Sequence, residues 1–123
     1  MIILTRWGNR EFTWGERTFV MGILNVSPDS FSGDGLAGDL DVIIARVKNM
    51  VDDGADLIDV GGESTRPGSK PVTVEEELQR VVPVIARRGR ELPVPISVDT
   101  YKAEVAAQAI ANGAGMVNDV SGL

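Results

Sequence analysis

The sequence predicts an α/β fold with a parallel sheet, preceded by a small β-hairpin. Two observations carry this prediction. Short apolar runs rich in branched residues alternate with longer segments of helical spacing, and the first residues alternate around a turn signal. Strands that alternate with helices require parallel pairing and right-handed crossovers. Periodicity alone leaves two architectures open, a doubly wound sheet and a β/α barrel.

The hairpin is predicted for residues 1–17. Apolar and polar residues alternate over 2–7 and 11–14, on either side of Gly8-Asn9-Arg10. Trp7 and Trp14 are expected to pack within the hairpin, because cross-strand aromatic pairs stabilise such ribbons. We expect the hairpin to cover part of a larger unit, residues 18–123.

The first strand–helix unit starts at residues 18–26, a nearly continuous apolar run typical of a strand buried on both faces. After a long loop, apolar residues recur at three- and four-residue spacing from Leu40 onward, which predicts a helix. Asp39 or Asp41 is expected near its N-cap, and Gly54 is expected to end it.

The second unit has a predicted strand at 56–61, a loop at 62–72 and a helix capped by Thr73. The stretch from Thr73 to Glu76 is a capping box. Pro83 is expected to kink or interrupt this helix.

The third unit has a predicted strand at 94–98, a short turn and a helix at 101–111 that stops at Asn112-Gly113. A fourth strand is predicted at 115–120. Four parallel strands are half of a (βα)8 TIM barrel, and the first and fourth would have unpaired edges.

The composition excludes several kinds of chemistry and partner. The 123 residues include no Cys and no His, which excludes disulfides, thiol nucleophiles, the usual zinc sites and a His base. The net charge of −6 disfavours nucleic acid and anionic membranes as partners. No apolar stretch approaches the roughly 20 residues of a membrane span, so a cytoplasmic location is expected.

Polar residues are predicted at the carboxyl ends of the four strands, where parallel α/β folds form their sites. They are Asn25, Asp59, Asp99 and the pair Asn118-Asp119. These side chains are expected to meet at one mouth. The alternative for any one of them is a local role in capping a turn or helix.

Two loops add further candidates. Loop 27–38 is glycine-rich and polar, as active-site flaps are. Loop 62–72 offers Arg66, whose guanidinium suits a phosphate or carboxylate, although a solvated surface arginine is the alternative. Neither loop fits a P-loop or a dinucleotide fingerprint.

Four stretches together resemble one family. MGILNVSPDSFS, DLIDVGGESTRPG, ISVDTYKAEVA and NDVSG occur in the order and at the spacing seen in dihydropteroate synthases. The resemblance implies the N-terminal half of a pterin-binding (βα)8 TIM barrel, namely about the first four strands and three helices after the hairpin. It covers nearly the whole chain but only half of such a barrel.

The family joins p-aminobenzoate to 7,8-dihydropterin-6-ylmethyl diphosphate, giving 7,8-dihydropteroate and pyrophosphate with the help of Mg²⁺. The resemblance therefore implies a transferase of folate synthesis with small-molecule substrates, homodimeric as a longer parent protein. This half alone is expected to be inactive, and it is expected to self-associate or fold loosely.

The resemblance also implies roles for single residues. Asp99, Thr65 and Arg66 are implied in catalysis, and Asn25 meets the metal and diphosphate. The implied substrate-binding residues are Asp59, Asp99, Asn118, Thr65, Arg66, Phe31 and Pro67.

Two departures and two alternatives accompany this interpretation. Gly33 follows Phe31-Ser32 where the family more often has Asp, which leaves the position of Asp34 open, and the groups of the barrel's second half are absent. The alternatives are a methyltetrahydrofolate-binding barrel of the corrinoid methyltransferase type, which lacks these two loops, and a non-catalytic half-barrel that binds pterin or assembles with another chain.

Overall fold

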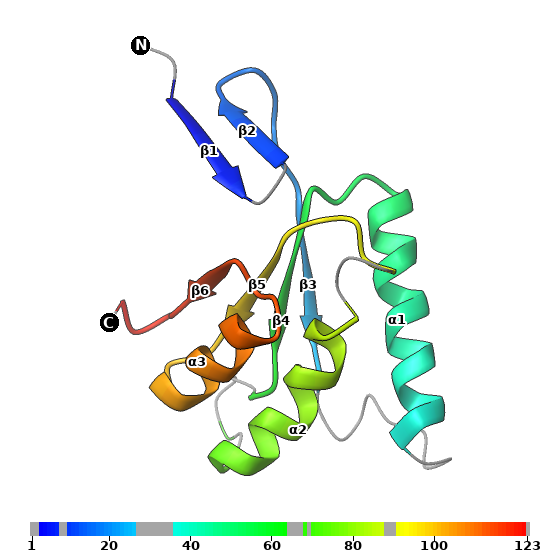
Figure 1. Cartoon of the computed structure of the whole chain (residues 1–123), viewed down its shortest axis with the longest axis vertical. Coiled ribbons are helices and arrows are strands. Elements are labelled where there is room, and N and C mark those ends of the chain that lie inside the picture. Colours follow the sequence, from blue (N-terminus) through cyan, green and yellow to red (C-terminus); the bar gives the residue numbers. More distant parts are fainter. Residues whose placement is uncertain are drawn as a thin grey trace.

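The computed structural model describes residues 3–7, 10–26, 36–63, 68, 70–87 and 91–122. It contains a two-stranded antiparallel hairpin and a four-stranded parallel sheet with three helices (Figure 1). The predicted α/β class and the hairpin before it are confirmed.

The hairpin consists of β1 (Ile3–Trp7) and β2 (Arg10–Trp14). Phe12 is buried at its centre, with the ring of Trp7 edge-on at 5.2 Å and that of Phe19 at 5.0 Å. Trp14 stacks on Phe12 at 6.0 Å. Both tryptophans thus belong to an aromatic cluster, as expected for packing residues.

The parallel sheet contains β3 (Met21–Asn25), β4 (Leu57–Gly61), β5 (Ile96–Asp99) and β6 (Met116–Asn118), in the order β3-β4-β5-β6. Each strand therefore pairs with the next one along the chain. A doubly wound sheet reverses its strand order at a switch point, whereas a barrel does not. The observed order thus favours the barrel architecture.

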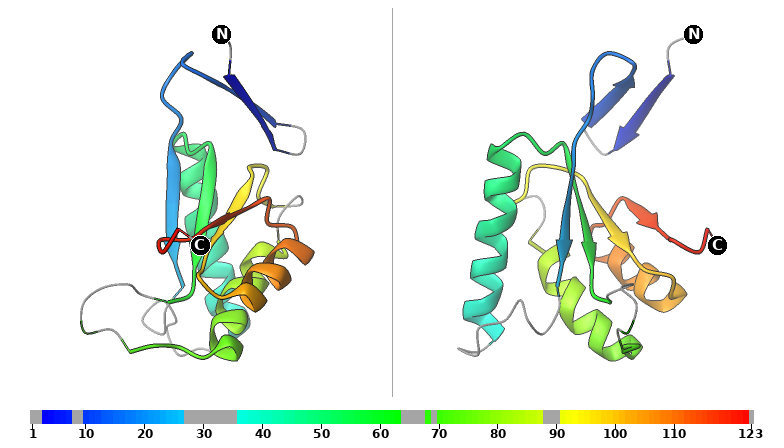
Figure 2. Two further views of the ribbon diagram at one scale, coloured as in Figure 1. Left: turned by 90° about the vertical axis from the view of Figure 1, so that its left-hand side faces the viewer. Right: turned by 180° about the vertical axis from the view of Figure 1, so that it is seen from behind.

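The helices are α1 (Leu36–Asp52), α2 (Val74–Ile85) and α3 (Ala103–Ala111), and all three lie on one side of the parallel sheet (Figure 2). The predicted stops are confirmed, because Gly54 and Gly113 both have positive φ. The other side of the sheet is not covered by any described helix.

Three helix predictions need correction. Helix α1 begins at Leu36, about one turn before the expected cap, although Gly38 lies within the added turn. Pro83 does not interrupt helix α2, which continues to Ile85, because only one amide donor is lost there and the helix ends soon after; the expected kink stays a prediction. Helix α3 begins at Ala103 rather than at 101, because Lys102 has an extended backbone.

The core lies between the helices and the sheet. Leu24, Val60 and Val98 are in register on neighbouring strands and are almost fully buried. Alternate residues point to the opposite face, so Ile23 remains 62% exposed beside Leu24 at 2%. The face without helices is thus the one that would line the inside of a barrel.

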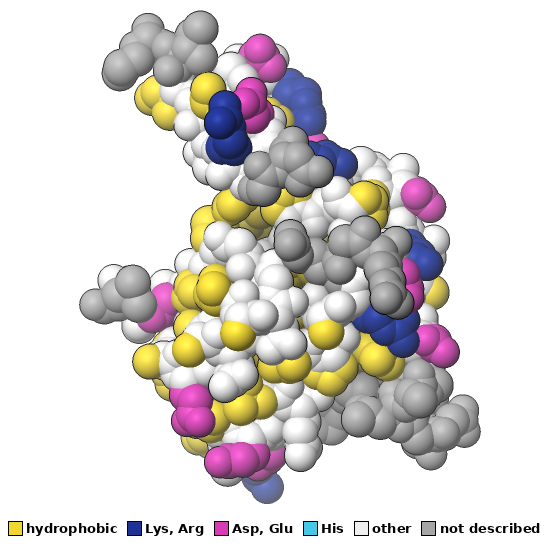
Figure 3. Space-filling model, in the orientation of Figure 1, with side chains coloured by type: hydrophobic (Ala, Val, Ile, Leu, Met, Phe, Trp, Pro, Cys, Tyr) yellow, Lys and Arg dark blue, Asp and Glu magenta, His cyan; other side chains and the backbone are white. Residues whose placement is uncertain are grey.

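The hairpin is attached at the amino-terminal ends of the parallel strands (Figure 1). Arg17 donates two hydrogen bonds to Asp56, at 2.6 and 3.1 Å, and Asp56 also accepts from the Val20 amide at 2.8 Å. Trp7 lies against Gly115, where an added Cβ would approach its ring to 3.3 Å. Charged side chains of both signs gather on the hairpin (Figure 3).

No helix in the described part of the chain is long and apolar enough to cross a membrane.

Candidate active site at the carboxyl ends of the parallel strands

Four residues at the strand ends form one row across the sheet. Asn25 is in register with Gly61, Gly61 with Asp99, and Asp99 with Asn118. Residues in register on neighbouring strands project to the same face. The structure therefore brings Asn25, Asp99 and Asn118 together on the face that lacks helices, as the sequence predicted.

Asp59 lies one layer deeper than predicted. It is the third residue of β4, two before the strand end, and it is in register with Ser97. It nevertheless faces the same side, because positions two apart along a strand share a face. Asp59 is 3% exposed, and its carboxylate accepts hydrogen bonds from Ser97 Oγ at 2.6 Å and Asn118 Nδ2 at 3.1 Å.

Asp99 is the carboxylate of the row, and its ionised form is disfavoured by its surroundings. Burial raises the pKa of Asp99, and the negative charges of Asp59, Glu77 and Asp119 raise it further. Among the described residues, no group donates a hydrogen bond to it. The ionised form of a half-buried carboxylate in such surroundings is stabilised by any ligand that brings N–H donors or positive charge.

Gly61 was not among the predicted site residues, although it makes room in the middle of the row. A Cβ added there would lie 3.3 Å from Asp99 Cβ, 3.5 Å from Asp99 Oδ2 and 3.6 Å from Asn25 Oδ1. The two side chains on either side thus lean into the space that glycine leaves free. Ser97 was also missed, although its place two residues before Asp99 on one strand could have indicated it.

Asp119 has a local role. Its Oδ1 accepts from the Ser121 amide at 2.8 Å and from Ser121 Oγ at 2.6 Å, an arrangement that stabilises a turn. For this residue the capping alternative describes what the structure contains, although its charge still acts on Asp99.

Phe31, Thr65, Arg66 and Pro67 lie outside the described residues, so their predicted positions stay predictions. The ends of the second loop are described. Glu63 Oε2 accepts a hydrogen bond from the Val72 amide at 2.8 Å, which joins the two ends of the loop.

A metal would have few protein ligands here. Within the described ranges, no group of three His, Cys, Asp or Glu side chains could hold an ion. Mg²⁺ needs no such group, because it is commonly held by one or two protein oxygens together with substrate phosphates and water. The amide oxygen of Asn25 fits this pattern.

The fold and the row of polar side chains define the class of the protein: a β/α-barrel type whose ligand site lies at the carboxyl ends of parallel strands. The sequence profile described as "Pterin binding enzyme" matches residues 21–123. The chain belongs to this pterin-binding enzyme family.

Within this family, the chain is similar to dihydropteroate synthases. The chain is 56% identical to the dihydropteroate synthase of Clostridium beijerinckii over 94% of its own length and 43% of that protein. It is also 56% identical to the dihydropteroate synthase of Bacillus subtilis, over 89% of the chain and 39% of that protein. The chain thus spans less than half the length of these relatives, and its resemblance to dihydropteroate synthases is confirmed.

Solved structures of dihydropteroate synthases are also similar to this chain. The Xanthomonas albilineans dihydropteroate synthase with 4-aminobenzoic acid matches with a TM-score of 0.86 at 48% identity, over 98% of this chain and 44% of that one. The Burkholderia cenocepacia enzyme complexed with 7,8-dihydropteroate matches with a TM-score of 0.78 at 43% identity, over 98% and 39%. The parallel sheet and three helices match part of the barrel of these enzymes.

Proposed function

We propose that the chain supplies the pterin-binding half of a dihydropteroate synthase site. In this reaction the amine of p-aminobenzoate forms a bond to the methylene carbon of 7,8-dihydropterin-6-ylmethyl diphosphate. The carbon–oxygen bond breaks, pyrophosphate leaves with the electron pair, and the amine loses a proton. The row of Asn25, Asp99 and Asn118, with Asp59 beneath it, is the single observation that carries the proposal.

Asp99 and Asn118 are proposed to hold the hydrogen-bonding edge of the pterin. A carboxylate accepts a pair of N–H donors well, and Asn118 is held in place by Asp59. The Asp99 anion would also stabilise positive charge that develops on the pterin methylene as the diphosphate leaves. Because that charge is greatest in the transition state, the interaction would raise turnover more than binding.

Asn25 is the residue proposed to meet Mg²⁺ and the diphosphate. When bound, the ion would neutralise charge on the departing diphosphate. Thr65 and Arg66 are proposed to contact the same group, and Phe31 and Pro67 to line the aminobenzoate pocket. A cytoplasmic location and a homodimeric longer protein complete the proposal.

Pyrophosphate release measured with both substrates tests the proposal. The chain alone is expected to be inactive. A longer protein can be made by joining residues 1–123 to the remaining part of the Clostridium beijerinckii relative, and we call it the completed chain. The completed chain should release pyrophosphate. Asp99→Asn in the completed chain should abolish turnover, while Asp53→Asn, in an exposed turn, should not.

Other outcomes identify the alternatives. A completed chain that binds the pterin but never releases pyrophosphate would favour the non-catalytic pterin-binding module. Binding of methyltetrahydrofolate in place of the pterin diphosphate would favour the corrinoid methyltransferase type of barrel.

A further inference from the structure

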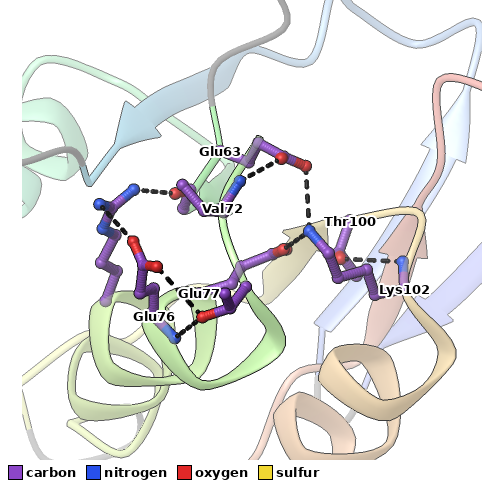
Figure 4. Close-up of polar contacts among 9 residues, drawn as sticks. Glu63, Val72, Glu76, Glu77, Thr100 and Lys102 are labelled. Atoms are coloured by element: carbon purple, nitrogen blue, oxygen red, sulfur yellow. Dashed lines mark hydrogen bonds and ion pairs between the residues drawn. The ribbon is translucent and has the colours of Figure 1, made fainter. Parts of the chain in front are cut away.

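One ammonium group joins three elements next to the candidate site (Figure 4). Lys102 Nζ lies 2.6 Å from Glu77 Oε1, on helix α2, and 3.1 Å from Glu63 Oε1, just after strand β4. Lys102 itself immediately precedes helix α3. The three side chains are 15%, 1% and 10% exposed for Lys102, Glu77 and Glu63.

The cluster is charged despite its burial. Burial opposes the charge on Lys102, but the two carboxylates outweigh it and raise the pKa of the amine. Burial likewise opposes the charge on Glu63, yet the Val72 amide, Tyr101 and Lys102 lower its pKa. Desolvation offsets much of the attraction within a buried ion pair. A cluster of this kind therefore fixes the relative positions of its side chains more than it stabilises the fold.

The cluster fixes both ends of the segment from Glu63 to Val72. Glu63 uses one oxygen for Lys102 and the other for the Val72 amide, at 2.8 Å. The preceding carbonyl, of Gly62, accepts from Arg80 Nη1 at 2.7 Å. A Cβ on Gly62 would lie 3.1 Å from Glu77 Cγ, so a larger residue there would require helix α2 or its side chains to shift.

The same cluster is joined to the catalytic strand end. Lys102 is three residues after Asp99, and the turn between them is held by hydrogen bonds of the backbone amides of Thr100 and Lys102. The Lys102 amide donates to Thr100 Oγ1 at 3.1 Å, and the Thr100 amide donates to the Asn118 carbonyl at 3.1 Å. Lys102 thus contacts the turn after Asp99 through its backbone and the ends of the segment through its side chain.

We propose that Lys102 is a positioning residue, which acts through Glu63 to hold the two described ends of the loop, Glu63 and Val72, in a fixed relation to Asp99. The inference rests on the proposed synthase function, in which this segment serves the diphosphate and aminobenzoate. In this role Lys102 acts without contacting the substrate. Loss of Lys102 therefore slows the condensation, which depends on the alignment of the two substrates, and leaves pterin binding by Asp99 and Asn118 nearly intact.

The test compares four variants of the completed chain. Lys102→Met removes the charge, Lys102→Arg keeps a cation for both carboxylates, and Glu63→Gln weakens the Lys102 contact while leaving the Lys102–Glu77 pair. Lys48→Met is the matched control, because Lys48 is half-exposed and its carboxylate partner Glu91 is 3.8 Å away. The readouts are kcat, KM for each substrate, the Kd of the pterin diphosphate and amide hydrogen exchange at Val72.

Lys102→Met should lower kcat/KM for p-aminobenzoate by about tenfold to a hundredfold, with less than about a threefold change in pterin Kd, a small effect on the affinity scale. Exchange at Val72 should accelerate, Lys102→Arg should recover most of the loss, and Lys48→Met should behave as the parent. If Lys102→Met fails to fold, Glu63→Gln should show the same changes in kcat/KM and in Val72 exchange, but smaller.

Unchanged Val72 exchange in a folded Lys102→Met or Glu63→Gln chain would overturn the inference, as would faster exchange with unchanged kcat/KM. A fall in pterin affinity equal to the fall in kcat/KM would also overturn it, since that pattern indicates general loss of structure. Failure of the proposed function looks different, because the parent completed chain itself would then release no pyrophosphate.

Discussion

The side-chain amide of Asn118 donates a hydrogen bond to Asp59 at 3.1 Å, although their strands β6 and β4 are not neighbours. Strand β5 lies between them, and the contact can pass over it because the intervening residue is Ser97. Ser97 is small, and its hydroxyl binds the other oxygen of the same carboxylate at 2.6 Å. One buried carboxylate thus links three strands on the face of the site.

Ser97→Ala should lower the free energy of unfolding of the completed chain by about 1–3 kcal/mol, because the buried carboxylate of Asp59 loses one of its two donors. Chemical denaturation monitored by circular dichroism measures the change. Ser121→Ala, in an exposed turn, is the control and should alter stability by less than about 0.5 kcal/mol. Equal losses in both variants would contradict the structural role given to Ser97.

Asp99→Asn should abolish turnover and yet stabilise the fold. The pKa of Asp99 is raised by burial and neighbouring negative charge, so its ionised form is disfavoured in the folded chain. This penalty is absent below about pH 4, the ordinary value for Asp. It grows as the pH rises through the raised pKa and is constant above it. Thermal unfolding of parent and variant should therefore coincide near pH 3 and diverge toward pH 7, and a less stable variant at pH 7 would contradict the prediction.

Gly61→Ala should weaken pterin binding, because the new methyl group would press on Asp99 Cβ at 3.3 Å and approach Asn25 Oδ1. Gly115→Ala provides a matched control at the opposite end of the sheet. Its methyl group meets the Trp7 ring at the same distance of 3.3 Å. Isothermal titration with the pterin diphosphate should show reduced affinity for Gly61→Ala alone, and the prediction fails if both variants bind equally well.

Asp56→Asn should make the chain's stability less dependent on pH in acid. Hydrogen bonds from Arg17 lower the pKa of Asp56 against the opposing effect of burial, and the Val20 amide lowers it further. The stabilising contribution is therefore complete above about pH 4 and is lost as the pH falls through the folded-state pKa. Unfolding midpoints recorded from pH 7 to pH 2 test this. If the two curves stay parallel in acid, the ion pair does not act as described.

The 123-residue chain alone should self-associate. Its parallel sheet ends in two outer strands, β3 and β6, and Ile23 on the face without helices is 62% exposed. Unpaired strand edges beside exposed apolar side chains favour association. Sedimentation velocity should detect dimers or larger species, whereas a compact monomer at all concentrations would contradict the expectation.

Much of the fold could be predicted from the sequence because its signals are local. The hairpin follows from the alternation around residue 9, and the cap of α2 follows from Thr73, whose Oγ1 accepts from the Glu76 amide at 3.1 Å. The start of α3 could not be predicted in this way. It depends on the bond between the Lys102 amide and Thr100, which forms only once that turn is in place.

The candidate site was predicted less completely. The sequence identified Asn25, Asp99 and Asn118, because their chemistry is visible and strand ends can be estimated from apolar runs. It placed Asp59 at the end of its strand, two residues too far along, because strand register determines depth and register is set by pairing with distant residues. The roles of Gly61 and Lys102 come from close contacts between segments far apart in the chain, which spacing alone does not reveal.

The position of the hairpin has a practical consequence. Since Trp7 lies against Gly115 and Arg17 holds Asp56, the hairpin occupies the end of the sheet away from Asp99. A fluorescent label or an affinity tag joined ahead of Ile3 would therefore stay clear of the end that carries Asp99, and such a probe could report on unfolding without disturbing the candidate site.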